Sequence, residues 1–413
     1  MTLKTTDPKI YNLIQTELAR QKEVIRLIPS ENYVSKAVLQ ATGSVLTNKY
    51  SEGYAGKRYY EGQEIIDQIE EIACQRAEKL FGVDHANVQP YSGSPANLAA
   101  YLALVPVGGK IMGMSLPHGG HLTHGWKVSA TSKFWQAVQY TVDSKTKMLN
   151  YDAIYKMAKA ERPKIIVAGA TAYPRFFDFK KFREIADSVN AYFLADIAHI
   201  AGLIVGGVHP SPVPYADVIT TTTHKTLRGP RGAMIMCKEK YAKQVDRAVF
   251  PGLQGGPHNH TTVGIAVALE EASKPEFKDY TKQIVKNAKV LSEELLRYGF
   301  DLVTGGTDNH LILIDMTNKG LTGKQTSVGL MKAGIETNCN TVPYDKRSPF
   351  DPSGIRVGTP AVTSRGMKEN EMKKIAAWMN EVVDNINDEK ILLRIREEVK
   401  EFCKDFRMPG IDE

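Results

Sequence analysis

A single lysine follows a run of four threonines in the segment TTTTHKTLRG, residues 220–229. Because β-branched residues favour strands over helices, the run predicts a buried strand that ends just before Lys225. His224 precedes the lysine, and the cationic segment RGPRG (228–232) follows it. A lysine that is partly desolvated and close to other cations loses its proton more easily, which makes its amine a nucleophile toward carbonyl groups. This pattern makes a functional amine a candidate, and the ordinary alternative, a lysine that simply reaches solvent, stays open at this point.

An acidic residue ends a second apolar run. AYFLAD (191–196) reads as a strand that ends at Asp196, and His199 follows three residues later. A lone buried carboxylate is costly unless a cation lies next to it. The protonated ring nitrogen of pyridoxal phosphate is such a cation, and enzymes that use this cofactor combine an acidic partner for the ring with a Schiff-base lysine. The competing interpretation is that Asp196 caps the helix that follows.

Three further segments could bind anions. Ser92-Gly93-Ser94 precedes Pro95 and an alanine-rich helical pattern, and the free N–H groups at such a helix start can bind phosphate. Arg356 lies between small residues in SGIRVGTPAV (353–362) and offers a planar fork that suits a carboxylate. QGGP (254–257) exposes backbone N–H groups that could form an anion nest. The ordinary alternatives are a helix cap, a surface arginine and a plain turn.

The segment HGGHLTHG (118–125) has two interpretations. His118, His121 and His124 are spaced by three and could bind zinc, which would make the protein a metal-dependent hydrolase. However, Gly119 and Gly120 interrupt regular geometry, and no carboxylate or cysteine lies nearby in the sequence. Once the lysine and the aspartate are considered, an imidazole stacked on a flat cofactor ring is the favoured interpretation, and no metal is expected.

The composition argues against several classes of protein. The net charge of +7, from 53 basic and 46 acidic residues, is spread among interspersed charges of both signs, so we expect no nucleic-acid partner. The longest nearly apolar run, IAGLIVGGV (200–208), is too short to span a bilayer, and the N-terminus has no apolar signal core. The four cysteines are far apart, which fits a reducing compartment. We therefore expect a cytoplasmic protein without a membrane partner.

Alternating patterns between residues 65 and 277 predict the elements that position these residues. Strands are expected at 110–115, 164–170, 191–196, 217–223 and 233–237, with helical patterns between several of them. This alternation indicates an α/β fold, in which a mostly parallel sheet is covered by helices on both faces. Ligands of such sheets bind at the carboxyl ends of the strands, where Asp196, Lys225 and His121 fall. Residues 1–64 are expected to form an arm and a tyrosine-rich loop, with a helix from Pro8 to Ile28, and residues 278–413 a smaller α+β domain.

With these pieces placed, the sequence resembles the serine hydroxymethyltransferase family over nearly its whole length. The resemblance rests on ten motifs in the family's order: SENYVS (30–35), NKYSEGYAGKRYY (48–60), VQPYSGSPAN (88–97), HGGHLTHG (118–125), DIAHIAGL (196–203), TTTTHKTLRGPRG (220–232), FPGLQGGP (250–257), DNHLILID (308–315), NTVPYD (340–345) and SGIRVGTPAVTSRG (353–366). It implies pyridoxal-phosphate fold type I, with an arm, a large domain built on a mixed, mostly parallel sheet of the seven-stranded type, and a smaller C-terminal domain.

The resemblance also implies the reaction. A transferase of this family moves the hydroxymethyl group of serine to tetrahydrofolate or a related pterin and gives glycine and 5,10-methylenetetrahydrofolate. The family therefore belongs to one-carbon and amino-acid metabolism. A side aldolase activity on β-hydroxy amino acids is expected as well. Two subunits would share each active site, so we expect a homodimer or a tetramer.

Each matching residue takes an implied role from the resemblance. Lys225 would form the Schiff base, Asp196 would pair with the pyridinium nitrogen, His121 would stack on the ring, and His199 would lie beside its phenolic oxygen. Arg356 and Ser30 would bind the substrate carboxylate, Glu52 would be the acid or base, and Tyr60 would lie close to the substrate. The other expected cofactor contacts are Ser92, Gly93, Ser94, Thr171, Thr222 and His224, with Tyr50 and Gly256 from the neighbouring subunit. The expected pterin contacts are Leu116, Gly120, Leu122, Ser348, Pro349 and Phe350.

Some features depart from the family, and some alternatives stay open. Pro29, Ala55 and Glu61 replace commoner residues, and the last two bear on the loop that carries Glu52. A folate-independent aldolase or another pyridoxal-phosphate lyase is the competing enzyme, against which Glu52 and the pterin-side residues argue. A binding protein without catalysis is a further alternative, but it would not need the phosphate and lysine positions to be filled so completely.

Overall fold

A computed structural model describes residues 2–412 of the 413-residue chain. Its centre is a seven-stranded sheet in which five neighbouring strands run parallel, and one strand, β10, runs antiparallel to both of its neighbours. In spatial order the strands are β4 (His85–Asn87), β10 (Ala233–Cys237), β9 (Val218–Thr222), β8 (Tyr192–Asp196), β7 (Ile165–Ala168), β5 (Lys110–Met114) and β6 (Gln136–Tyr140). The predicted mixed, mostly parallel α/β sheet is confirmed.

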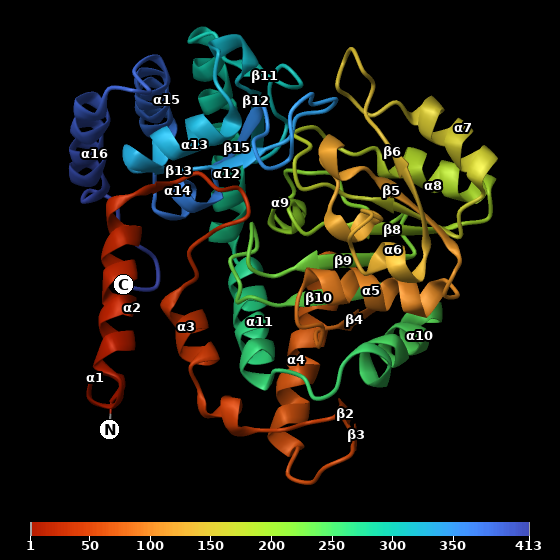
Figure 1. Cartoon of the computed structure of the whole chain (residues 1–413). Helices are drawn as coiled ribbons and strands as arrows, with labels where there is room; N and C mark the ends of the chain where they lie inside the picture. The colour runs from red at the N-terminus through yellow and green to blue at the C-terminus, as the bar shows by residue number, and fades with distance from the viewer. Residues whose placement is uncertain (1, 413) are drawn as a thin grey trace.

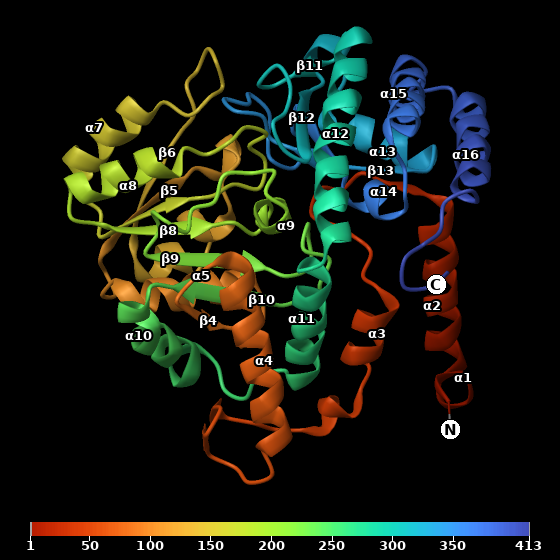
Figure 2. The same ribbon diagram turned by 180° about the vertical axis from the view of Figure 1, so that it is seen from behind.

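Hydrophobic residues alternate between the two faces of this sheet. Met112, Ile166 and Ile219 belong to one buried cluster, whereas their chain neighbours Ile111, Ile165 and Val218 belong to another. Such alternation follows from the two-residue period of a strand, and both faces are apolar because helices cover both. Helices α4 (Glu64–Phe81), α7 (Tyr151–Glu161), α8 (Phe179–Ser188) and α11 (Asn259–Ala272) contribute to the first cluster, and α5 (Gly93–Leu104) and α10 (Ala242–Arg247) to the second (Figures 1 and 2).

The C-terminal part of the chain surrounds a second, antiparallel sheet. Its order is β11 (Asp301–Leu302), β12 (Leu311–Asp315), β15 (Gly354–Gly358) and β14 (Asn338–Asn340), packed with α13 (Gly323–Lys332), α15 (Glu369–Asp384) and α16 (Glu389–Cys403). Helix α12 (Pro275–Arg297) joins the two parts, since Phe277 and Ile284 lie in the first core and Leu291 and Leu295 in the second (Figure 1). We call the two parts the large-sheet and small-sheet domains, and keep 278 as the proposed boundary within this helix.

The N-terminal arm differs from its predicted form at one end. Helix α2 (Pro8–Glu23) stops before Val24, which is extended, instead of continuing to Ile28. The next residues form strand β1 (Ile25–Arg26), which pairs in parallel with β13 (Ile335–Glu336) of the small-sheet domain. Ile25 and Leu27 are completely buried there. Burial against a partner strand thus overrides the helical spacing of the apolar residues.

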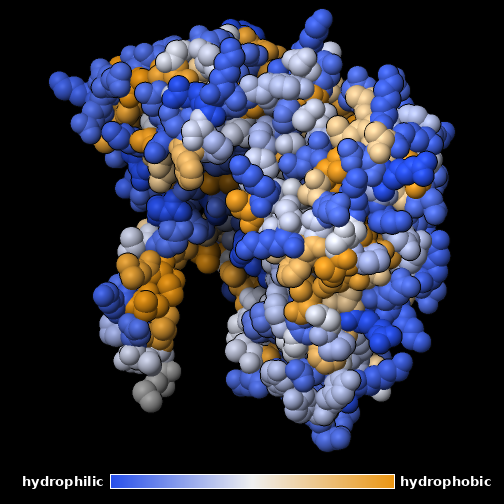
Figure 3. Space-filling model, turned by 45° about the vertical axis from the view of Figure 1, so that its right-hand side comes forward, coloured by the Kyte–Doolittle hydropathy of each residue, from blue (hydrophilic) through white to orange (hydrophobic). Residues whose placement is uncertain are grey.

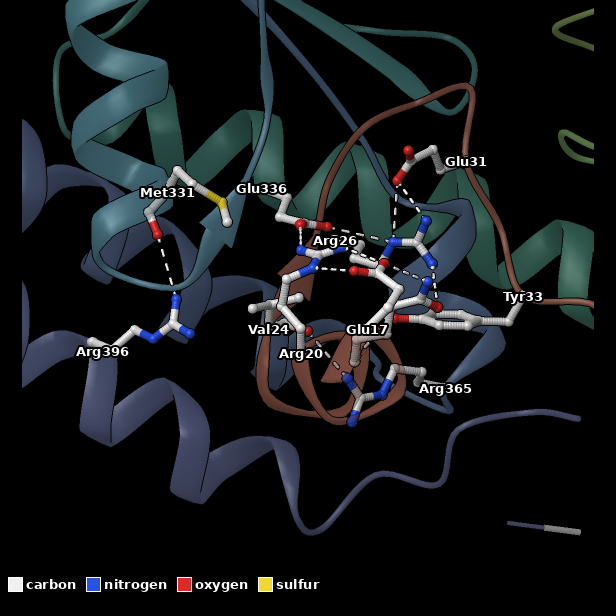
Figure 4. Close-up of polar contacts among 11 residues, drawn as sticks. Glu17, Arg20, Val24, Arg26, Glu31, Tyr33, Met331, Glu336, Arg365 and Arg396 are labelled. Carbon is white, nitrogen blue, oxygen red and sulfur yellow. Dashed lines mark hydrogen bonds and ion pairs between the residues drawn. The ribbon is translucent and has the colours of Figure 1, made fainter. Parts of the chain in front are cut away.

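A cluster of charges attaches the arm to the small-sheet domain. Arg20 of α2 and Arg26 of β1 both form ion pairs with Glu336 of β13, and Arg26 also binds Glu31 (Figure 4). The Arg26 guanidinium lies 4.9 Å from the centre of the Tyr33 ring. Glu31 and Tyr33 alternate with Ser30 and Asn32 in the chain, so these contacts help to fix the segment that leads into the site. Among residues 2–412, none of the helices combines the length and the apolar composition of a membrane span.

Candidate active site

Lys225 lies just past the carboxyl end of β9, where the chain turns back. The N–H of Gly229 donates to the carbonyl of Thr223 over 2.7 Å, and Arg228 between them has a left-handed φ of 58°. Asn32 of the arm donates to the Lys225 carbonyl over 2.9 Å. The lysine is 9% exposed, and burial, with the nearby charges of Arg356 and Arg231, lowers its pKa to about 8 against the opposing effect of Asp196. Among the described residues its ammonium makes no hydrogen bond or ion pair, so the amine is available for a ligand.

Asp196 ends the neighbouring strand β8 and remains a carboxylate. Burial tends to raise its pKa, but the hydrogen bond from His124, the charges of His124 and His121, and the hydrogen bond from Asn97 together hold that pKa well below its usual range. One oxygen, Oδ2, accepts from His124 Nε2 and from Asn97 Nδ2, both over 2.9 Å. Because α9 (Ala201–Val205) has Ile200 as its N-terminal cap, Asp196 does not cap that helix, and the competing interpretation is wrong.

Sequence reasoning missed two residues that fix this carboxylate. His124 appeared only as a possible zinc ligand, and Asn97 only as part of a motif. Asn97 also accepts a hydrogen bond from Thr220 Oγ1 over 2.6 Å, and Thr220 is the register partner of Asp196. The first threonine of the run therefore supports Asp196 through Asn97. The sequence contains one indication of their role, because both residues lie in segments that were predicted to form the site. Only the fold shows which polar groups meet.

The histidine loop does not bring the three predicted zinc ligands together. His118 packs edge-on against Tyr344, with ring centres 4.6 Å apart. In the described part of the chain, the metal-type cluster that forms is His121, His124 and Asp196, within 4.8 Å of one another. Its groups are already engaged, since His124 bonds to Asp196 and His121 Nδ1 lies 2.7 Å from Thr123 Oγ1. Burial, followed by the charge of His124, lowers the pKa of His121 to about 4, so this ring is neutral near pH 7.

Arg356 is a buried cation that has no carboxylate partner within the described residues. It lies on β15, is 9% exposed, and donates from Nε to Asn338 Oδ1 over 3.2 Å and from Nη1 to the Thr171 carbonyl. Burial lowers its pKa to about 10. Within residues 2–412 Arg356 forms no ion pair, and neither of these hydrogen bonds is to an acidic group. An uncompensated buried guanidinium is costly, and a bound carboxylate would offset that cost.

His199 forms a buried pair with His310, a residue that sequence reasoning did not single out. Their rings are stacked with centres 5.6 Å apart, and Nδ1 of His199 lies 3.4 Å from Nε2 of His310. Burial, with the charges of Lys225 and Arg356 next, holds the pKa of His199 well below its usual range. Burial also lowers the pKa of His310 to about 3. Both rings are therefore neutral donors and acceptors near the lysine.

The segment Ser92-Gly93-Ser94 opens helix α5 beside the end of β9. Ser92 is the N-terminal cap residue, but its side chain makes no capping bond, and the following Pro95 has no N–H. A Cβ at Gly93 would lie 2.8 Å from Thr222 Cγ2, so the loop needs glycine to approach the strand. His224 Nδ1 is buried without a hydrogen-bond partner, and burial lowers the pKa of His224 to about 3. A helix start with unused donors can hold a phosphate.

The remaining predicted residues lie on the surrounding loops. Two of these predicted residues bond to each other, since the Thr171 hydroxyl donates to the Gly120 carbonyl over 3.0 Å. Gly120 has no room for a side chain, because a Cβ there would lie 1.9 Å from the Met114 carbonyl oxygen. Leu122 is 45% exposed and Phe350 is 90% exposed. The structure places Leu116, Gly120 and Leu122 on the loop of His121, Ser30 in the turn after β1, and Ser348, Pro349 and Phe350 on an exposed loop of the small-sheet domain.

Tyr50, Glu52 and Tyr60 form a separate, largely exposed cluster. The Tyr50 hydroxyl donates to Glu52 Oε1 over 3.1 Å, and the Tyr60 hydroxyl to Oε2 over 3.4 Å. A Cβ at Gly256 would lie 3.1 Å from Cζ of Tyr50, so the QGGP turn packs on this ring. The charge of Glu52 raises the pKa of Tyr60. Within residues 2–412, no hydrogen bond or ion pair joins the cluster to Lys225 or Asp196.

These groups fit pyridoxal phosphate. Within residues 2–412 the buried amine of Lys225 has no hydrogen-bond or ion-pair partner, Asp196 is held as an anion for a ring cation, and the start of α5 has unused donors. The carboxyl ends of parallel strands bring the three together, where ligands of such sheets bind. The fold and the site thus define a pyridoxal-phosphate-dependent enzyme of fold type I.

Comparisons with known proteins give the family. The family model for serine hydroxymethyltransferase matches residues 3–379. Proteins named serine hydroxymethyltransferase are 65% identical to this chain in Acidothermus cellulolyticus (99% of this chain, 97% of the relative), 60% in Desulfotalea psychrophila (99% and 96%) and 60% in Sorangium cellulosum (99% and 97%). The chain belongs to the serine hydroxymethyltransferase family, whose enzymes use pyridoxal phosphate and tetrahydrofolate to interconvert serine and glycine.

Proposed function

We propose that this chain transfers the hydroxymethyl group of serine to tetrahydrofolate, and that Lys225 and Asp196 are the centre of its site. The observation that carries the proposal is the unpartnered, buried amine of Lys225, whose pKa of about 8 leaves part of it neutral near physiological pH. When bound, the cofactor supplies an electron sink for the pair released as the Cα–Cβ bond of serine breaks. The residues of the chain hold and orient the reactants around it.

Each side chain of the inner site has a proposed task. Asp196, fixed by His124 and Asn97, keeps a negative charge next to the ring nitrogen. His121 is neutral and can lie flat on the ring, and His199 can bond to its phenolic oxygen. The donors expected around the phosphate and the rest of the cofactor are Ser92, Gly93, Ser94, Thr171, Thr222 and His224.

Substrate binding is assigned to the groups around the cofactor. Arg356 binds the serine carboxylate together with Ser30, because its buried guanidinium has no acidic partner among the described residues. Glu52 manages the proton of the serine hydroxyl or of the pterin, with Tyr60 beside it, since folate-linked transfer needs an acid or base near both reactants. The pterin lies against Leu116, Gly120, Leu122, Ser348, Pro349 and Phe350.

The active site is proposed to be shared between two copies of the chain. The arm helix α2 stands away from the rest of the molecule with an apolar side uncovered (Figure 3), and Ile10, Leu13 and Ile14 on it are 44%, 57% and 49% exposed. Tyr50 is 56% exposed in the cluster that contains Glu52 and packs on Gly256. A homodimer, alone or within a tetramer, would cover these surfaces and place Tyr50, Glu52 and Gly256 in the partner's site.

The proposal is tested by mixing two inactive variants. Lys225→Ala should lose the absorbance that the cofactor acquires on bonding to the lysine, together with turnover. Glu52→Gln should keep that absorbance and lose the folate-dependent reaction. When the two are unfolded together and refolded, half of the dimers are mixed and one site in each carries both native residues, so about a quarter of the wild-type activity should return. Activity no higher than that of the separate variants would contradict shared sites, and full activity of Lys225→Ala would contradict the assignment of the lysine.

A side reaction and a location complete the proposal. Slow cleavage of β-hydroxy amino acids without the pterin is expected, because Lys225, Asp196 and Arg356 are assigned to the cofactor and the amino acid and none of them is assigned to the pterin. Comparing cleavage rates with and without tetrahydrofolate tests which reaction is the main one.

A cytoplasmic location is proposed from the four free thiols, Cys74, Cys237, Cys339 and Cys403, which suit a reducing compartment.

A further inference from the structure

A loop of the small-sheet domain contacts the large-sheet domain at one edge of the site. Residues 341–352 lie between β14 and β15, and a hairpin that contains Val142 and Leu149 lies between β6 and α7. In Figures 1 and 2 the two segments approach each other from opposite domains. A cavity of about 830 Å³ is lined by residues of both, among them Lys145, Lys147, Val342 and Tyr344.

Tyr344 makes the polar and ring contacts of this loop across the boundary, beside a small apolar cluster that contains Val342 and Ala172. Its hydroxyl donates to the Val142 carbonyl over 2.7 Å, its ring packs edge-on against His118 with centres 4.6 Å apart, and the Lys147 ammonium lies 4.8 Å from the ring centre. Tyr344 has a φ of 65°, an uncommon conformation for a residue with a side chain, which surrounding contacts must maintain. Among the described residues, it makes the one hydrogen bond between this loop and the large-sheet domain.

The rest of the loop is tied to its own domain. Asp345 accepts from the hydroxyl of Ser353 over 2.7 Å and from the N–H of Arg347 over 2.9 Å, and Arg347 pairs with Asp351. Ser348, Pro349 and Phe350 are exposed, and Phe350 is 90% exposed. Loss of the Tyr344 contacts should therefore loosen the placement of these three residues against the large-sheet domain.

Tyr344 joins the 341–352 loop to the segment that contains His118, and the pterin is assigned to residues of these two segments. His118 ends the short helix that begins at Leu116, directly before Gly119 and Gly120. Tyr344 comes four residues before Ser348. The serine carboxylate has a different anchor, since Arg356 is held by Thr171 and Asn338. Loss of the Tyr344 contacts should therefore affect the pterin side of the site and leave the serine side unchanged.

We propose that Tyr344 is a positioning residue that clamps the 345–350 loop onto the His118 segment and so shapes the binding site for the reduced pterin. This inference rests on the proposed function. The contacts of the ring with His118 and with Lys147 are each worth a few-fold in the equilibrium between a docked and an undocked loop. The hydroxyl adds a smaller share through Val142, because the carbonyl can bond to water when the hydroxyl is removed.

The test compares Tyr344→Ala and Tyr344→Phe with a matched control, Tyr155→Ala. Tyr155 is 42% exposed, compared with 47% for Tyr344, and also has a lysine over its ring, Lys159 at 5.4 Å, but it lies on the outer helix α7. In the holoenzyme, Tyr344→Ala should raise the KM for tetrahydrofolate, and its Kd measured in the presence of glycine, by about tenfold, and Tyr344→Phe by about two- to threefold. In both Tyr344 variants the KM for serine should stay within about twofold of wild type, and in Tyr155→Ala the KM values for serine and tetrahydrofolate should both stay within that range.

Trypsin gives a readout that does not depend on activity. Lys346 and Arg347 offer cleavage sites in the clamped loop, and Tyr344→Ala should speed cleavage there while the control does not. Unchanged cleavage together with unchanged tetrahydrofolate affinity would overturn the clamp. Faster cleavage with unchanged affinity would overturn its role in pterin binding, and equal rises in both KM values would show a general structural effect instead. A wild-type enzyme that binds no tetrahydrofolate would refute the proposed function itself.

Discussion

The substitution Lys225→Met should make the cofactor-free protein more stable at neutral pH. The pKa of Lys225 falls from 10.5 to about 8 in the folded chain, chiefly because the ammonium is buried. The unfolded chain therefore binds the proton more tightly than the folded chain. Below about pH 8 the lysine is protonated in both states, and the full cost of burying the charge, about 3 kcal/mol, opposes folding. Between about pH 8 and 10.5 the folded chain has lost the proton, so the cost disappears as pH rises.

Methionine keeps most of the length of the side chain and removes the charge. The free energy of unfolding should rise by about 3 kcal/mol at pH 7 and hardly at all at pH 10.5. An unfolding entropy of roughly 2.1 cal/mol/K per residue converts that gain to a rise in Tm of about 3 °C for a chain of this length. Differential scanning calorimetry of the cofactor-free proteins, at equal concentrations and at both pH values, measures this difference in Tm. Lys282→Met is the control, because the side chain of Lys282 is 66% exposed.

Three results would refute the explanation of the gain by the burial of the Lys225 charge. If Lys225→Met has the same Tm as wild type at pH 7, the ammonium is not penalised by burial, and the site does not prepare a neutral amine. If the gain in Tm is equal at pH 7 and pH 10.5, it comes from packing of the methionine and not from removal of a charge. A gain of similar size in Lys282→Met would show that any loss of positive charge stabilises this basic protein.

Two further substitutions test the charges around the lysine. Asp196→Asn removes the anion that His124 holds in place, so turnover should fall at least about 100-fold while the far-ultraviolet circular dichroism stays that of wild type; near-normal turnover would contradict the role of the carboxylate. Arg356→Lys cannot form a bidentate pair, so the KM for serine should rise by about 10- to 100-fold with the KM for tetrahydrofolate nearly unchanged; a parallel rise in both would contradict a carboxylate-specific role.

The strands of the sheet were predictable where both faces are buried. All residues of β7, β9 and β10 are buried, and their continuous apolar or β-branched runs have no helical period. Strands β4 and β6 were not predicted. β4 has three residues, and β6, at the edge of the sheet, has the half-exposed sequence QAVQY, so neither carries a strong apolar signal. The end of α2 was wrong because the apolar residues after Glu23 serve a strand pairing that depends on β13, more than 300 residues away.

The site was predictable where one residue at one strand end defines the chemistry. Lys225 and Asp196 could be found because each ends an apolar run, and parallel strands bring their carboxyl ends together. His124, Asn97 and His310 could not be found in this way. Their roles depend on which polar groups meet after folding, such as His124 Nε2 at 2.9 Å from Asp196 Oδ2, and no spacing in the sequence encodes that choice.

The three charges of the inner site do not neutralise one another by direct contact. Asp196 bonds to His124, Asn97 and a backbone N–H, and it forms no ion pair with Lys225 or Arg356 in the described residues. The Lys225 amine has no hydrogen-bond or ion-pair partner in the part of the chain that the structure describes, and Arg356 bonds to an amide and a carbonyl. Each group therefore remains available for a different part of the ligands: Asp196 for the ring nitrogen, the neutral amine of Lys225 for the aldehyde, and Arg356 for the serine carboxylate. Because charges buried without partners oppose folding, binding of the cofactor and of serine should each stabilise the folded chain as well as complete the site.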